Sequence, residues 1–230
     1  SGAMQLRGAN TYMGATTING GVLSILGSLS DSTAVDVSSG ALYHLHANDT
    51  IGSLSGEGGV NLSSPSSTLM FWDEHKLIVG ANNQSSSFSG VMSGSGELTK
   101  IGTGMLNLSG DNTTYALMDI QEGTLRVEGS INAGSVGVKV GSSGTYEVAN
   151  SDGIAALQGE GSVVLIGSSE LKIKGSTYTQ FDGIISGTGS LKKSGAGGLM
   201  LTGANTYTGI TEISNGELGV TGSLSDSTSV

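Results

Sequence analysis

The sequence contains no cysteine, a single proline and few charged side chains, which make up 12% of its 230 residues. The absence of cysteine excludes disulfide bonds, thiolate chemistry and cysteine-based zinc sites. The scarcity of charge argues against a chain kept disordered by self-repulsion. No apolar run approaches the roughly 18–20 residues that a membrane-spanning helix requires. What remains is a chain rich in Gly, Ser and Thr, whose apolar residues occur in short segments.

Basic residues are scarce as well, because Lys and Arg number 9 against 19 Asp and Glu, giving a formal charge of −10. Such a chain repels phosphate groups, so neither nucleic acid nor an anionic membrane surface is expected as a partner. No signal peptide is recognisable, and residues 1–4 are interpreted as a possible cloning scar. If the parent protein is exported, its signal is expected to lie outside this stretch.

Glycine is abundant, with 40 residues, and its combination with one proline indicates many tight turns rather than collagen or a flexible linker. Between these turns, short runs alternate apolar and polar residues. Alternation with a period of two predicts strands that bury one face. We therefore predict that the following residues face a single elongated interior: Val35, Val37, Tyr43, Leu45, Leu106, Leu108, Leu125, Val127, Val138, Val140, Val148, Leu199, Leu201, Leu218 and Val220.

Internal repeats organise the chain. The segment Leu6–Tyr12 recurs almost unchanged as Leu201–Tyr207. Weaker matches divide the single fragment 1–230 into repeat units of about 6–105 and 106–198 and a partial unit of 199–230. Repeats of short strands predict an all-β parallel β-helix, a solenoid of about nine or ten coils with roughly 22–25 residues in each coil.

Equivalent residues in these units mark turns and an insertion. Asn10, Asn112 and Asn205 occupy equivalent positions, where we predict that the side chains bond to nearby backbone. Replacing Asn205 by alanine is then expected to cost about 1 kcal/mol. The offset between equivalent residues changes from 103 to 93 between Leu62 and Phe88, which predicts a ten-residue insertion in the first unit.

The stretch Gly197–Val220 resembles the passenger-associated repeat of bacterial autotransporters, the type V secretion proteins. The residues that carry the resemblance are Gly197, Leu199, Leu201, Gly203, Asn205, Thr206, Tyr207, Thr208, Gly209, Thr211, Ile213, Gly216, Leu218 and Val220. Leu6–Leu23 matches the same pattern well, and Leu106–Val127 matches it with departures. The resemblance implies a right-handed parallel β-helix, exposed on the bacterial outer membrane or secreted. It also implies an outer-membrane β-barrel in the same parent chain, outside this stretch.

This family places adhesins, aggregation factors, toxins and a few enzymes on one scaffold, so the resemblance alone selects no activity. We expect a non-enzymatic, adhesin-like passenger module that binds a host-cell surface protein, matrix or glycan, or a second passenger copy. The alternatives are a secreted virulence factor that acts on a host-cell receptor, and an inert β-helical stalk. An enzyme would need acidic or basic groups that converge in one groove, and the sequence reveals none.

The insertion holds the best candidate binding residues: Phe71, Trp72, Asp73, Glu74, His75 and Lys76. Inserted loops project from a solenoid, and an aromatic residue among mixed charges suits contact with a protein or a sugar. We predict that Phe71–Lys76 protrudes from the rod or visibly lengthens one coil, and that Trp72 is not fully buried. The alternative is a lengthened coil, with Leu69 and Phe71 pointing inward and the charges in solvent.

Other polar residues predict no catalytic centre, cofactor or metal site. Asp73, Glu74 and His75 are consecutive, and consecutive residues of a strand point to opposite faces, so the three do not converge. His44 and His46 share one face, a spacing that suits two imidazole ligands, but a third ligand is not evident. We interpret these histidines as solvent-facing. Lys100, Lys192 and Lys193 are likewise predicted to form one solvated face.

Overall fold

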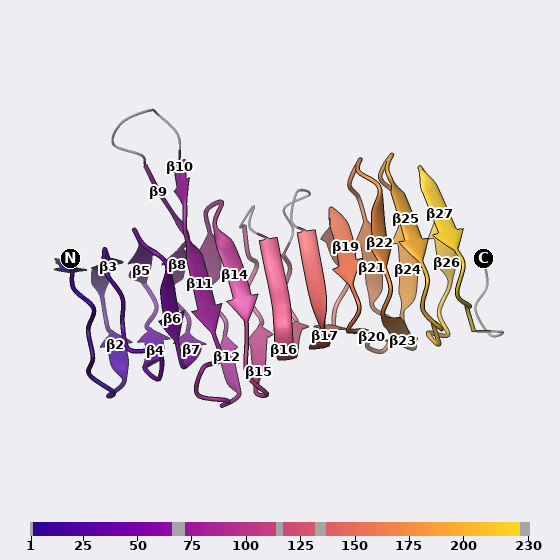
Figure 1. Cartoon of the computed structure of the whole chain (residues 1–230). Coiled ribbons are helices and arrows are strands. Elements are labelled where there is room, and N and C mark those ends of the chain that lie inside the picture. Colours follow the sequence, from indigo (N-terminus) through magenta and orange to yellow (C-terminus); the bar gives the residue numbers. More distant parts are fainter. Residues whose placement is uncertain (1, 66–71, 114–116, 132–136, 226–230) are drawn as a thin grey trace.

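The computed structural model describes residues 2–65, 72–113, 117–131 and 137–225. Within them the chain consists of short strands that stack side by side along one axis (Figure 1). Every strand pair is parallel except the pair of β9 (Ser63–Pro65) and β10 (Trp72–Glu74). The result is a parallel β-solenoid of about ten turns, which confirms the predicted fold class. No helix in the described part of the chain could cross a membrane.

The strands lie on three faces of the solenoid. The first face carries β1 (Ala3–Leu6), β3 (Gly21–Ile25), β5 (Ala41–Leu45), β8 (Gly59–Asn61), β13 (Val91–Ser93), β18 (Asp152–Ile154), β21 (Glu170–Ile173), β24 (Ser190–Lys193) and β26 (Thr211–Ile213). The second carries β2 (Thr16–Ile18), β4 (Ala34–Val37), β7 (Ser53–Gly56), β12 (Ser86–Phe88), β15 (Met105–Leu108), β20 (Ser162–Leu165) and β23 (Ile184–Gly187). The third carries β6 (Asp49–Ile51), β11 (Lys76–Val79), β14 (Glu97–Lys100), β19 (Ala156–Gly159), β22 (Thr179–Phe181), β25 (Gly198–Leu201) and β27 (Glu217–Val220).

Two long strands join the second and third faces. β16 (Leu117–Val127) and β17 (Gly137–Val148) each run through a corner, so their first halves belong to the third face and their second halves to the second. On the first face, residues 111–113 and 130–131 continue the stack between β13 and β18, because Thr113 N donates to Met92 O and Ile131 N to Asp152 Oδ1. The second and third faces are therefore continuous ladders along the rod, and the first face consists of two sheets linked by these hydrogen bonds.

Apolar side chains fill the interior in registered rows. Leu106, Leu125, Tyr146, Val163 and Ile185 are successive neighbours on the second face, and all five are buried. Rows of this kind arise because the period-two pattern of every strand places alternate residues inward and parallel pairing aligns them.

The predicted inward residues are buried except at the carboxyl-terminal coil. Leu218 is partly buried against the core, and Val220 is 38% exposed although it lies in register with buried Leu201 and so faces the interior. The cause is stacking rather than orientation, because Val220 pairs with buried Leu201 on one side and no described strand pairs with β27 on the other.

The repeat advances by one face from unit to unit. Leu6 ends β1 on the first face, its equivalent Leu108 ends β15 on the second, and Leu201 ends β25 on the third. Because the chain visits the faces in the order first, third, second, each unit contains a whole number of coils plus about two thirds of a coil. Residues that are equivalent in sequence consequently face different sides of the rod.

The turn asparagines occupy equivalent conformations, as predicted. Asn205 Nδ2 donates to Gly203 O in its own turn at 3.0 Å and to Ser223 O in the next coil at 3.2 Å. Its Oδ1 accepts a hydrogen bond from Ile185 N of the preceding coil at 3.0 Å. Asn112 repeats all three bonds, and Asn10 repeats the two donor bonds. One amide therefore ties three successive coils together.

At two buried positions a carboxyl group, instead of an amide, links neighbouring coils. Asp49 Oδ1 accepts a hydrogen bond from Leu29 N at 2.9 Å, and Asp152 Oδ1 accepts one from Ile131 N at 3.2 Å. The second oxygen of each carboxyl group accepts a bond from a buried tyrosine, Tyr43 for Asp49 and Tyr146 for Asp152. Burial raises the pKa of both aspartates above the ordinary value, although these hydrogen bonds oppose the rise. The interior thus contains two acids that bind a proton more readily than usual.

Candidate binding surface

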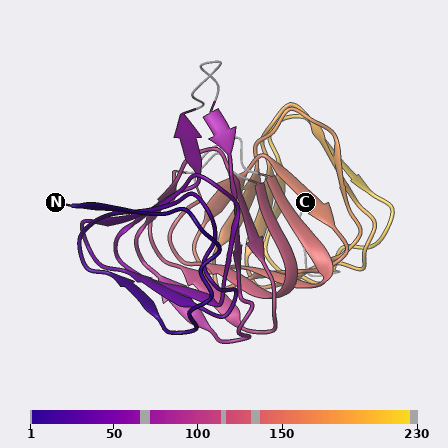
Figure 2. The ribbon, with the colours of Figure 1, turned by 60° about the vertical axis from the view of Figure 1, so that its left-hand side comes forward.

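The insertion leaves the solenoid as a β-hairpin. β9 and β10 form an antiparallel two-stranded sheet, in which Trp72 pairs with Pro65 and Glu74 with Ser63. The hairpin projects beyond the outline of the coils, as Figures 1 and 2 show from two sides. It projects because the coils above and below fix their own strand register and leave no room for extra residues in the stack.

The six candidate binding residues are divided by this geometry. Phe71 lies outside the described residues. Trp72, Asp73 and Glu74 form β10, in the projecting part, and the exposure of the Trp72 side chain stays a prediction. His75 and Lys76 belong to the root, where the chain re-enters the stack: His75 N donates to Leu62 O at 3.0 Å and Glu97 N donates to His75 O at 2.9 Å.

Lys76 is held at the root by two contacts. Its Nζ lies 2.6 Å from Glu97 Oε1, and its backbone N donates to Asn48 Oδ1 at 2.8 Å. The Lys76 side chain is 33% exposed. Lys76 therefore secures the base of the hairpin, and the predicted protrusion does not extend to it or to His75.

The three histidines of the chain gather near this root. The rings of His44 and His46 have centroids 4.1 Å apart. Burial lowers the pKa of His46, and the neighbouring His44 and His75 lower it further. Sequence spacing pairs His44 with His46 but gives no sign that His75 joins them, because the stacking of coils brings it there. Among the residues that the structure describes, no three His, Cys, Asp or Glu side chains are placed to hold a metal ion.

The prediction of one solvated lysine face is wrong for two of its three members. Lys100 and Lys193 are both 1% exposed. Lys100 Nζ donates to the carbonyl oxygens of Ile101 at 2.6 Å and Gly102 at 2.7 Å, and Lys193 Nζ donates to Gly195 O. Burial lowers the pKa of Lys100 to about 8 and lowers that of Lys193. These ammonium groups bind the carbonyl oxygens of turns and are closed off from ligands.

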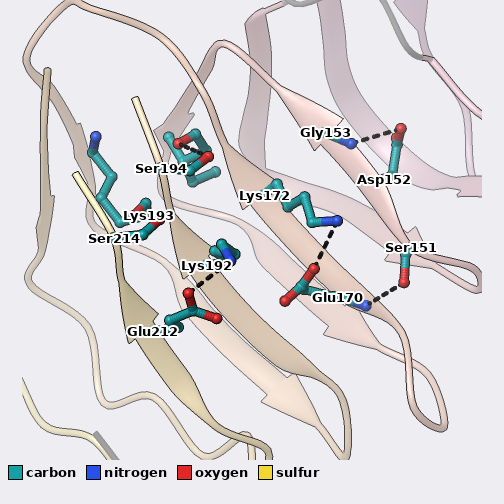
Figure 3. A network of polar contacts seen from close by, with 11 residues as sticks. Ser151, Asp152, Gly153, Glu170, Lys172, Lys192, Lys193, Ser194, Glu212 and Ser214 are labelled. Carbon is teal, nitrogen blue, oxygen red and sulfur yellow. Dashed lines mark hydrogen bonds and ion pairs between the residues drawn. The ribbon is translucent and has the colours of Figure 1, made fainter. Parts of the chain in front are cut away.

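Lys192 does face solvent, within a charged network on the first face (Figure 3). Its Nζ lies 2.6 Å from Glu212 Oε1, and Lys172 Nζ lies 2.9 Å from Glu170 Oε1. The hydrogen bond to Glu212 raises the pKa of Lys192. Lys172 and Lys192 are direct neighbours in register, so the two carboxylates offset the repulsion between the lysines. Each of these four charged groups has an intramolecular partner, so the network stabilises the packing of neighbouring coils.

Comparison with known proteins identifies the repeat. The chain matches the Passenger-associated-transport-repeat family over residues 1–25, 98–127 and 191–220. A relative named Adhesin BmaC autotransporter, from Brucella suis biovar 1 (strain 1330), is 33% identical over 232 residues, which cover 93% of this chain and 7% of the relative. This chain belongs to the autotransporter passenger domains. No solved structure matches this passenger region.

The three family matches correspond to structurally equivalent parts of the passenger region. Each contains the strand that ends at Leu6, Leu108 or Leu201 and the asparagine turn that follows it. The projecting hairpin lies between the first and second matches. The projecting hairpin is therefore an addition to the coils, whereas His75 and Lys76 belong to the regular stack.

Proposed function

We propose that this passenger region is an adhesive module without catalytic activity, displayed on the bacterial surface or released from it. The relative from Brucella suis is named an adhesin, which supports this assignment. The hairpin β9–β10 is the observation that carries the proposal, because it extends beyond the coils in the segment where the repeat is interrupted.

The hairpin suits contact with a partner for two reasons. A strand pair that projects from a rod reaches a surface before the flat faces of the rod do. Its two strands pair only with each other among the described strands, so their outer backbone edges remain available. The partner would be a host-cell surface protein, matrix or glycan, or a second passenger copy, and the contact would involve Phe71–Glu74.

A clean test removes the hairpin and keeps its root. Because His75 N donates to Leu62 O, a two-residue Asn-Gly turn can replace residues 63–74 and close the strands at that pair. We expect the variant to keep its β circular dichroism and a melting temperature within a few degrees of the wild type. Its binding to epithelial cells, to matrix-coated surfaces and to itself should fall at least about tenfold.

The matched control is Ile184→Ala, which removes an exposed apolar side chain from the second face and leaves the hairpin intact. It should bind as the wild type does. Unchanged binding of the hairpin variant would indicate that the partner contacts the strand faces instead. A wild-type region that binds none of these surfaces would favour an inert stalk, and a cellular response to the soluble protein alone would favour a secreted factor.

A further inference from the structure

An exposed tyrosine stands on the third face, away from the hairpin. Tyr178, which directly precedes β22, is 58% exposed and is the most exposed aromatic ring among the side chains that the structure describes. Of the tyrosines at repeat positions, Tyr43, Tyr146 and Tyr207 are buried, and Tyr12 in the first coil is 42% exposed. Tyr178 thus belongs neither to the core nor to the repeated motif.

The ring of Tyr178 lies over the neighbouring strand. Tyr178 lies beside Gly198 in the register of β22 and β25. A β-carbon on Gly198 would lie 2.4 Å from Cδ2 and 2.8 Å from Cε2 of the ring, so the ring occupies the space that a side chain at position 198 would take. Gly198 is buried as a result. The tyrosine therefore presents a preformed aromatic surface whose outer side faces solvent.

Uncharged hydrogen-bonding groups flank this ring on the same face. Gln180 follows two residues later in β22, and Gln158 is its neighbour in β19; both are exposed. Gln180 Nε2 donates to Asp182 Oδ1 at 2.7 Å, and Thr202 Oγ1 donates to the same oxygen at 2.5 Å. These bonds hold the amide of Gln180 in place and leave its carbonyl oxygen and the amide of Gln158 to meet a ligand.

This combination suits a sugar better than a protein side chain or an anion. An aromatic face carries partial negative charge and attracts the C–H groups of a pyranose ring, while amides and carboxylates bond to its hydroxyl groups. Protein hot spots insert into pockets, whereas Tyr178 stands on the flat outer side of a sheet. An anion would be repelled by the carboxylate of Asp182, and none of these four residues is a cation that could bind it.

We propose that the surface formed by Tyr178, Gln158, Gln180 and Asp182 binds a neutral sugar, which stacks on the tyrosine ring. The proposal rests on the adhesive function proposed above and names one class of target for it. The surface is separate from the hairpin, because β11 at the root and β22 are five coil steps apart on the third face, about 24 Å. The two proposals can therefore fail independently.

The test measures binding of two neutral probes, the β-1,4-linked N-acetylglucosamine tetramer and maltotetraose, by saturation-transfer NMR and calorimetry. We expect the wild type to bind at least one of them in a manner that changes little between about 0.05 and 0.5 M salt. Tyr178→Ala should lower the affinity about tenfold, and Tyr178→Phe should stay within about threefold because it keeps the ring.

Controls separate this site from folding and from the hairpin. Tyr12→Ala removes another exposed tyrosine and should not change sugar binding, nor should replacement of residues 63–74. Both Tyr178 variants should keep the wild-type melting temperature within a few degrees. The proposal is overturned if neither neutral probe binds, if Tyr178→Ala binds as tightly as the wild type, or if only a heparin tetrasaccharide or a second copy of the chain binds.

Discussion

Replacing Asn205 by alanine tests the principle that one amide joins three coils. The side chain of Asn205 is 2% exposed and makes three hydrogen bonds to backbone. Alanine would leave the buried N–H of Ile185 without its partner, at about 1–3 kcal/mol, and would remove two further bonds worth about 0.5–1.5 kcal/mol each. After partial relaxation we expect a loss of about 2–4 kcal/mol, more than the 1 kcal/mol expected for an isolated turn.

The chain supplies its own control in Asn10. Asn10 makes the two equivalent donor bonds, but no described coil precedes it and its side chain is less buried. Asn10→Ala should therefore cost only about 1 kcal/mol. Urea unfolding gives the two losses, and amide hydrogen exchange at Ile185 reports the local effect, since a solenoid can open in segments. Equal losses for the two variants, or unchanged exchange at Ile185, would refute the three-coil bridge.

Three further perturbations examine the interior. Burial raises the folded-state pKa of Asp152, so protonation of this carboxyl group stabilises the fold most below the unfolded pKa of about 3.9, and that stabilisation is lost as pH rises through the folded pKa. In urea titrations, Asp152→Asn should therefore lose less stability than the wild type between about pH 4 and 7. Lys100→Met should cost about 1–3 kcal/mol by leaving turn carbonyls unpaired, whereas Lys192→Met, at a partly exposed side chain, should cost under about 1 kcal/mol, measured by thermal unfolding. Gly187→Ala should cost more than about 2 kcal/mol, because φ is +102° and the new Cβ would lie 2.1 Å from Leu165 O. Gly40→Ala, with φ +77° and open space around the new Cβ, should cost about 1 kcal/mol, and equal melting temperatures for the two variants would contradict this reasoning.

The sequence predicts the backbone plan well because two independent regularities agree. Period-two alternation identifies the inward residues, and the repeat aligns turns such as those of Asn112 and Asn205. The change of offset also identifies the insertion. Its conformation as an antiparallel hairpin does not follow from the offset, because an insertion of that length can equally lengthen a coil.

The errors have physical causes. Lys100 follows inward Leu98 by two residues, and Lys193 follows inward Leu191 by two, so alternation itself points both lysines inward. Charge suggests the opposite, but the free carbonyl oxygens of the adjacent turns satisfy a buried ammonium group. The proximity of His75 to His46 and the position of Tyr178 over Gly198 depend on neighbours about 20 to 30 residues away, which only the stacking reveals.

The advance of one face per repeat unit bears on how such a protein changes over generations. Recombination between repeats would delete or duplicate a unit and leave every remaining strand with a compatible neighbour, so the rod would still fold. Everything beyond the altered unit would nevertheless turn by about a third of a revolution relative to what precedes it. Gain or loss of one unit would thus turn the hairpin or the Tyr178 surface to another side of the rod, without altering a residue of the hairpin or of that surface.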